Sequence, residues 1–244
     1  MWKSTVNMKK IKIIPNNPES KLILTISSAK NYIPDWYKKS PQKIVGLEKL
    51  SLVPYNPMST TSTYKKCSPF LDALTNGYIF SLSQDIEVML KDDGSPYIVW
   101  RGISNDVVSN HSLEQWDGLF YPENCHKHVY KWENGFTIKT PKGFSTLFSH
   151  PHNRFDLPFY SLSGVVDTDK YNLPIHFPFF LKKDFVGIIK AGTPLAQINF
   201  FKRHHWYRNI KKYKKEFTDT ANLNFYSRIE RSYKNSSWQK KDYN

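Results

Sequence analysis

Short alternations of apolar and polar residues recur along the chain, each with the length of a β-strand. In the first half these runs cover 10–14, 22–26, 78–82, 86–90 and 97–100. In the second half they cover 129–132, 136–140, 144–148 and several stretches between 163 and 201. Asp92-Asp93-Gly94 and Glu133-Asn134-Gly135 are typical hairpin turns. The pattern therefore predicts a mainly β fold, built as an antiparallel or mixed barrel.

Helical signals occur at two places. Near residue 70, Ser68 is typical of the N-cap residue before a helix, Pro69 of its first residue, and Gly77 of the position after its end. A second helix is expected over roughly 221–234, behind residues suited to cap it. We therefore expect one short helix beside the strands and one C-terminal helix.

The composition changes at two points along the chain. Residues 1–66 contain strand-like runs and end in a polar loop rich in Pro, Ser and Thr. Residues 67–201 hold most of the predicted strands, and residues 202–244 are basic with aromatic residues between the charges. We expect an N-terminal extension, a β-barrel core and a basic aromatic C-terminal tail.

The chain has 244 residues and a net charge of +14, which favours contact with nucleic acid, nucleotides or an acidic protein surface. The alternative cause is compositional, because an AT-rich genome also enriches Lys, Asn, Ile and Tyr. No apolar run approaches the roughly eighteen residues of a membrane span, and the first residues lack the apolar core of a signal peptide. The expectation is a cytoplasmic protein of a bacterium or an infected cell, without membrane contact.

The two cysteines, Cys67 and Cys125, have no CxxC spacing, so we predict neither a zinc site nor a disulfide framework. His126 and His128 lie beside Cys125, but ligands this close need a distant further ligand to complete a tetrahedral site. No metal site is expected here. Glycine-rich phosphate loops, the zinc deaminase signature and the serine hydrolase elbow are also absent from the sequence.

Asp167 is the best single candidate for chemistry. It follows the short apolar run 164–166, so the end of a strand would hold its carboxylate rigidly. A carboxylate held in this way can orient water for attack on an α-phosphate. The alternative is that Asp167 and Asp169 only stabilise a turn.

Two segments together resemble a known family. They are Ser163–Tyr171, which reads SGVVDTDKY, and Lys190–Phe200, which reads KAGTPLAQINF. In this order and spacing they resemble the core of the dUTPase and dCTP deaminase superfamily, over roughly residues 136–201. The resemblance implies a dUTPase-like barrel of the β-clip type that binds a deoxynucleotide. The whole chain also resembles a family of uncharacterised phage and bacterial proteins.

The resemblance to the dUTPase superfamily implies roles for individual residues. Asp167 takes the place of the acid that activates water, and Tyr171 that of the ring that packs on deoxyribose. Gln197 takes the place of a glutamine buried on a strand, and we expect its amide to be hydrogen-bonded because an unpaired buried amide is costly. Family members use Mg²⁺ held by the triphosphate and commonly form homotrimers with sites between chains.

Ser149 and Arg154 lie where members of that superfamily offer Ser and Arg side chains to the phosphates. The guanidinium fork of Arg154 would suit phosphate oxygens. The alternative is a structural salt bridge from Arg154 to Asp156 or Asp169.

Two functions stay open. The first is binding of a deoxynucleoside triphosphate, with or without its hydrolysis. The second is an inactive fold that serves as a structural or interaction module and binds nucleic acid or an acidic partner through its tail. The superfamily's Pro-Arg-Ser-Ser-Gly segment and its glycine-rich C-terminal arm are absent here, which favours the second function. Whether the protein is an enzyme is therefore left open.

Basic and aromatic residues are interleaved directly after the predicted core. Such a segment suits single-stranded nucleic acid, because its charges meet phosphates while its rings stack on bases. The alternative is a solvated segment whose rings pack back onto the barrel. The residues predicted to bind are Lys202, Arg203, Trp206, Arg208, Lys211 and Lys212.

Overall fold

The computed structural model describes residues 10–18, 20, 25–44, 63–101, 107–210, 234 and 237–243. The chain forms two compact units. One combines residues 1–29 with 77–203, and the other combines residues 30–76 with 204–244. These boundaries differ from those expected from the composition, because the first strands belong to the β unit and the helix near residue 70 does not.

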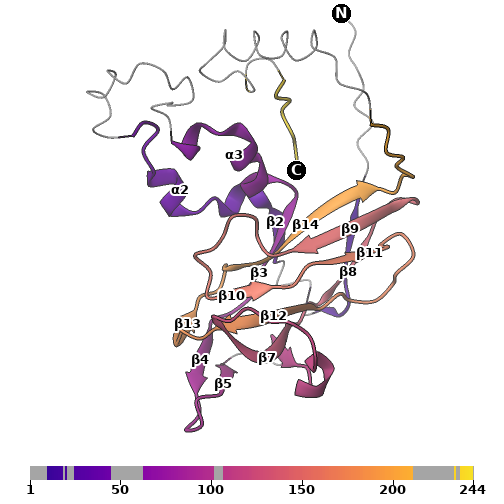
Figure 1. The fold of residues 1–244 in the computed structure, drawn as a ribbon. Coiled ribbons are helices and arrows are strands. Elements are labelled where there is room, and N and C mark those ends of the chain that lie inside the picture. Colours follow the sequence, from indigo (N-terminus) through magenta and orange to yellow (C-terminus); the bar gives the residue numbers. More distant parts are fainter. Residues whose placement is uncertain are drawn as a thin grey trace, which may run out of the picture. The chain divides into compact units, whose positions relative to one another are not determined.

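The β unit is built from four antiparallel sheets. The five-stranded sheet has the order β11 (Gly164–Val166), β9 (Phe144–Ser149), β14 (Pro194–Lys202), β3 (Tyr78–Ser81) and β2 (Ile26–Ser28). The four-stranded sheet has the order β10 (Phe159–Ser161), β12 (Phe177–Lys182), β7 (Cys125–Trp132) and β6 (Val108–Asn110). Figure 1 shows β11, β9 and β14 as neighbouring arrows.

The two smaller sheets complete the unit. One has the order β13 (Gly187–Ile189), β4 (Ile86–Leu90) and β5 (Pro96–Trp100), and the other pairs β1 (Lys12–Pro15) with β8 (Phe136–Lys139). A short 3-10 helix, η4 (Leu113–Trp116), lies between β6 and β7 in the sequence. The mainly β class predicted from the sequence is confirmed. Within the described part of the chain the sheets are open, and their strands do not close into a barrel.

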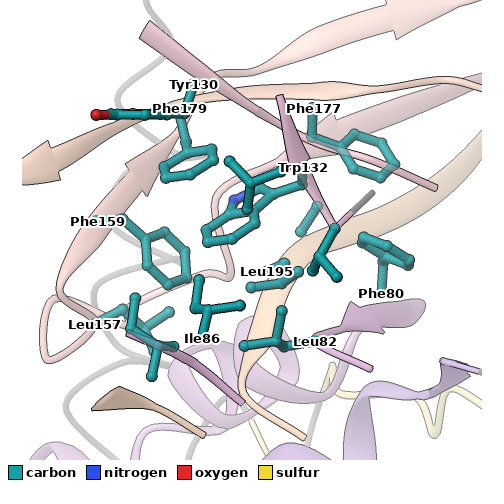
Figure 2. Packing of buried hydrophobic residues seen from close by; sticks show 14 of the residues in the cluster. Phe80, Leu82, Ile86, Tyr130, Trp132, Leu157, Phe159, Phe177, Phe179 and Leu195 are labelled. Carbon is teal, nitrogen blue, oxygen red and sulfur yellow. The ribbon is translucent and has the colours of Figure 1, made fainter. Parts of the chain in front are cut away.

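The core of the β unit is aromatic and centres on Trp132. Its ring stacks on Phe179, with ring centroids 3.6 Å apart and planes 3° apart, and meets Phe159 edge to face at 5.0 Å. The indole nitrogen donates to Ser161 Oγ at 3.3 Å, so the buried polar atom is satisfied. Figure 2 shows Trp132 among these rings and Leu195. Trp132 and Phe179 reach each other because their strands, β7 and β12, pair directly.

The second unit holds four more short helices among the described residues. They are η1 (Ala29–Tyr32, whose first residue belongs to the β unit), α2 (Asp35–Lys39), η3 (Tyr64–Lys66) and α3 (Ser68–Thr75). The helix predicted near residue 70 is confirmed, although the residue before its first turn is Cys67 and not Ser68. The expected helix over 221–234 lies outside the described residues, apart from Lys234. None of the described helices is long and apolar enough to cross a membrane.

Aromatic contacts hold the second unit together. Tyr37 is buried and stacks on Phe70, with ring centroids 5.9 Å apart, and Trp36 meets both rings edge-on. Near the C-terminus, Trp238 donates to Asp72 on α3 at 2.8 Å. The C-terminal residues are thus part of this unit's own packing, which matters for the design of truncations.

Candidate functional site

Asp167 lies directly after the edge strand β11, in a tight turn. Its backbone carbonyl accepts hydrogen bonds from the amides of Lys170 and Tyr171, both at 2.9 Å. The neighbouring Thr168 is fully buried, and its hydroxyl bonds to those of Thr140 at 2.8 Å and Thr146 at 2.7 Å. These contacts anchor the turn to the sheet and hold the Asp167 side chain in one place.

Hydrogen bonds from Ser145 and Arg203 hold one oxygen of the Asp167 carboxylate, Oδ1. Its Oδ1 accepts from Ser145 Oγ at 2.6 Å and from Arg203 Nη1 at 3.0 Å. Among the described residues, no group donates to Oδ2, and about half of the side chain is exposed. Asp167 therefore offers one solvent-facing oxygen in a fixed orientation.

Arg203 joins this turn to the end of β14. Its guanidinium bonds in a fork to Asp169, with Nη1 2.9 Å from Oδ1, and also contacts Ser145 Oγ at 2.9 Å. Asp169 accepts a further hydrogen bond from the Gly143 amide at 2.8 Å, and only 4% of its side chain is exposed. Asp169 therefore stabilises the turn. For this residue the structure shows the structural role that was the alternative drawn from the sequence.

The same contacts set the charge of both carboxylates. The Ser145 hydroxyl lowers the pKa of Asp167, and the charge of Arg203 lowers it further. Arg203 is the largest cause of the lowered pKa of Asp169, followed by the Gly143 amide. Both groups are therefore ionised at neutral pH. An ionised carboxylate with a lowered pKa is a weak base, so Asp167 is suited to orienting water more than to removing its proton outright.

These lowered pKa values predict how acid affects stability. Each carboxylate stabilises the fold above its unfolded value near 3.8, and this contribution is lost as the pH falls through the lower folded value. Arg203→Met removes a cause of both shifts, so we expect a shallower loss of unfolding free energy below about pH 4. Urea titrations between about pH 2 and pH 7 measure this slope. Arg208→Met, at an exposed position, is the control, and equal slopes in all three proteins would contradict the assignment.

Tyr171 lies close to Asp167. Both residues line a shallow surface depression of about 510 Å³, together with Val165, Val166 and Lys170. The Tyr171 ring is 42% exposed and Val165 is 61% exposed. The structure thus brings two of the predicted site residues together, and Lys170 lines the same depression with them.

Ser149 and Gln197 lie together at the other end of β9. They are register partners on β9 and β14, and Gln197 is 1% exposed with its Oε1 accepting from the His152 amide at 2.8 Å. The prediction of a buried, hydrogen-bonded Gln197 is confirmed. Ser149 Oγ lies 3.1 Å from His152 Nε2. Ser145 and Ser149 share one face of β9 but are about 13 Å apart along it, so this cluster and Asp167 do not converge within one chain.

Arg154 is engaged in a forked ion pair with Asp156, through Nε to Oδ1 and Nη2 to Oδ2, both at 2.9 Å. The structural salt bridge was one of the two alternatives drawn from the sequence, and Asp156 is the partner. Only 12% of the Arg154 side chain is exposed. Its guanidinium would have to exchange this partner before it could bind a phosphate.

The structure assigns a different role to Arg203 from the one predicted. The sequence places it in a nucleic-acid-binding run, whereas its guanidinium is held by Asp167 and Asp169. Ser145 and Asp169 were not predicted as parts of the site. The β14–β9 register places Phe201 opposite Ser145, which brings Arg203 to the level of the turn. No local sequence signal reports that register.

The first part of the basic tail is open to solvent. Lys202 is exposed at the end of β14, and residues 204–210 have no regular secondary structure. Trp206 and Tyr207 are 89% and 86% exposed, and the Trp206 ring meets that of His204 edge to face with ring centroids 6.2 Å apart. Arg208 is exposed as well, while Lys211 and Lys212 lie outside the described residues.

Within the described segments, no three His, Cys, Asp or Glu side chains are placed to hold a metal ion. Cys125 is fully buried, and burial raises the pKa of its thiol to about 11. Asp167 and Asp169 do not fit a directly bound Mg²⁺, because the positive charge of Arg203 contacts both carboxylates.

Comparison with models of known protein families and with curated proteins yields no match for this chain.

Proposed function

We propose that the protein binds a deoxynucleoside triphosphate beside the Asp167 turn and hydrolyses it to a monophosphate and pyrophosphate. The observation that supports this most directly is the half-exposed Asp167 carboxylate, oriented by Ser145 and Arg203 with Oδ2 left to accept from water. The exposed Tyr171 ring provides a surface for the sugar, and Lys170 provides a charge for the phosphates. A dUTPase-like arrangement of this sheet is part of the proposal.

In the proposed reaction, Asp167 accepts a hydrogen bond from a water molecule and directs its oxygen at the α-phosphorus. The new P–O bond forms as the bond from the α-phosphorus to the bridging oxygen breaks, and pyrophosphate leaves. The water proton passes to Asp167 and then to solvent. Positioning supplies most of the acceleration, since the carboxylate is a weak base.

The distance between the two clusters supports a site shared between copies of the chain. Asp167 and Tyr171 lie at one end of β9, whereas Ser149 and Gln197 lie at the other. Among the described residues, the strand β11 pairs with β9 alone and Val165 on it is exposed, which leaves this edge for a second copy to approach the turn. A homotrimer in which Ser149 of one copy faces Asp167 of another is the arrangement we propose.

Release of pyrophosphate from each deoxynucleoside triphosphate, supplied with Mg²⁺, tests this proposal. We expect one substrate to be turned over in preference to the others, with monophosphate and pyrophosphate formed in equal amounts. Absence of turnover with every substrate would contradict the enzyme proposal and favour the second function.

The second candidate function is binding of single-stranded nucleic acid through residues 204–210. The high exposure of Trp206 and Tyr207 next to Arg208 supports it, because exposed rings beside a cation suit base stacking with phosphate contact. An inactive dUTPase-like fold that carries this segment would be an interaction module and not an enzyme.

We predict weak binding of a labelled single-stranded oligonucleotide at low salt, reduced at least about tenfold by the double change Trp206→Ala and Tyr207→Ala. Each phosphate contact adds about 0.7 to the log–log salt slope, so titration at several salt concentrations counts the contacts. Substitution is preferable to truncation, because removal of residues after Phe201 also removes Arg203 and Trp238 from their partners.

The matched control for this experiment is the double change Tyr64→Ala and Phe120→Ala, which removes two rings that are 77% and 83% exposed elsewhere. We expect this variant to bind as the wild type does. Equal losses in both double variants, or no binding at low salt, would exclude residues 204–210 as the binding segment.

A further inference from the structure

A cavity of about 770 Å³ lies in the β unit and takes no part in the functions proposed above. Its floor is apolar and includes Phe80, Leu82 and Leu195 from the core. Its rim is polar and includes Asn17, from the segment after β1, and Lys131, near the end of β7. This size, with an apolar floor and a few polar groups, is typical of sites for small organic ligands.

The wall of the cavity is rigid where the turn from β7 to β8 meets the segment after β1. A Cβ atom at Gly135 would lie 2.3 Å from Ser20 Oγ and 3.0 Å from Ser20 Cβ, so a larger residue would require the Ser20 side chain to move. Asn134 is nearly buried, with Oδ1 accepting from the Phe136 amide at 2.7 Å and Nδ2 donating to the Ile175 carbonyl at 2.9 Å. The cavity is therefore formed before any ligand arrives.

The rim offers hydrogen-bond donors. Asn17 Oδ1 accepts from the backbone amide of Ser20 at 2.7 Å, and because that amide can only donate, the orientation of the Asn17 side chain is settled. Its Nδ2 is left as a donor with no partner among the described residues. Lys131 Nζ is 3.9 Å from Glu133 Oε1, too far for a hydrogen bond, and is a second donor.

The charges on the lining cancel. Lys131 and Glu133 are the lining residues that carry charge at neutral pH. Each oxygen of Glu133 already has one close partner, since Ser109 donates to Oε1 and His176 Nδ1 lies 2.6 Å from Oε2. A polyanion would gain little here, whereas an uncharged ligand rich in acceptors would satisfy the donors.

We propose that this cavity binds an uncharged heterocycle of nucleoside size whose ring carbonyls accept hydrogen bonds from Asn17 and Lys131. The apolar floor takes the ring, and the neutral lining favours a ligand without phosphate. This site is separate from the Asp167 turn, and the proposal does not depend on hydrolysis there.

Isothermal titration of the full chain with thymidine, inosine and adenosine tests this site. Thymidine and inosine carry carbonyl groups on the base, whereas adenosine does not. We expect thymidine or inosine to bind at least about tenfold more tightly than adenosine, and thymidine monophosphate to bind no more tightly than thymidine. No binding by either carbonyl-bearing nucleoside, or equal binding of adenosine, would overturn the proposal.

Variants of single residues test where thymidine binds. Asn17→Asp keeps the acceptor for the Ser20 amide and replaces the Nδ2 donor with an oxygen, so we expect at least about tenfold weaker binding of thymidine. Asn110→Asp adds the same charge at an exposed position of the same unit and should leave binding unchanged. Tyr171→Ala removes the ring proposed to take the sugar at the turn and should also leave thymidine binding unchanged. Loss of thymidine binding in Tyr171→Ala, with retention in Asn17→Asp, would assign the nucleoside to the turn and overturn this inference.

Discussion

Asp167→Asn is expected to lower the rate of pyrophosphate release by at least about a hundredfold, while substrate binding changes much less. The amide is nearly isosteric and still accepts from Ser145 and Arg203 through its oxygen, so the turn should keep its geometry. The atom that faces solvent becomes an NH₂ group, which donates and cannot accept from water. The loss should therefore appear in kcat and not in KM.

The matched control is Asp92→Asn, which makes the same chemical change in the exposed hairpin turn between β4 and β5. It should retain full turnover and stability. A variant Ser145→Ala removes one of the two donors to Asp167 Oδ1 and should give a smaller loss of kcat. Full activity in Asp167→Asn would remove this residue from the mechanism, whatever the behaviour of Ser145→Ala.

Trp132→Ala is expected to cost about 3–5 kcal/mol of unfolding free energy, the largest stability effect we predict. The indole is fully buried, stacks on Phe179, meets Phe159 edge-on and donates to Ser161. Its removal leaves a cavity in the centre of the β unit and takes away the indole donor to the Ser161 hydroxyl, which still donates to the Leu195 carbonyl at 2.6 Å. The free energy and its denaturant dependence follow from urea titration monitored by far-UV circular dichroism.

Trp206→Ala is the matched control for this prediction, because it makes the same substitution at a tryptophan that is 89% exposed. We expect its effect to stay within about 0.5 kcal/mol. Similar costs in the two variants would show that Trp132 does not hold the core together.

The alternation of apolar and polar residues was sufficient for the class of fold and for most strands. The runs at 78–82, 86–90 and 144–148 correspond to β3, β4 and β9, because their β-branched and aromatic residues favour strands. The runs said nothing about which strands far apart in sequence would pair. The open edges of the sheets and the division of the chain into two units depend on those pairings.

The candidate site also contains residues that the sequence predicted and residues whose role only the strand pairing revealed. Asp167 was predicted from its place after a short apolar run, whereas Tyr171 and the burial of Gln197 were predicted from the resemblance of two short segments to a known family. The role of Arg203 depends on the register of β14 against β9, which places a residue 36 positions further along the chain onto Asp167. The partner of Arg154 was undecided between Asp156 and Asp169 until the structure showed Arg203 holding the latter.

By itself, then, the sequence determined the strands, the turn that carries Asp167, and the excess of positive charge. Only the tertiary structure decided which of those charges are paired. Arg203 forms ion pairs with two carboxylates, whereas Trp206, three residues later, is exposed to solvent. The physical reason is that strand propensity and turn geometry are local, whereas ion pairs and exposure depend on which distant segments meet. Which distant segments pack together is set by the burial of apolar surface across the whole unit.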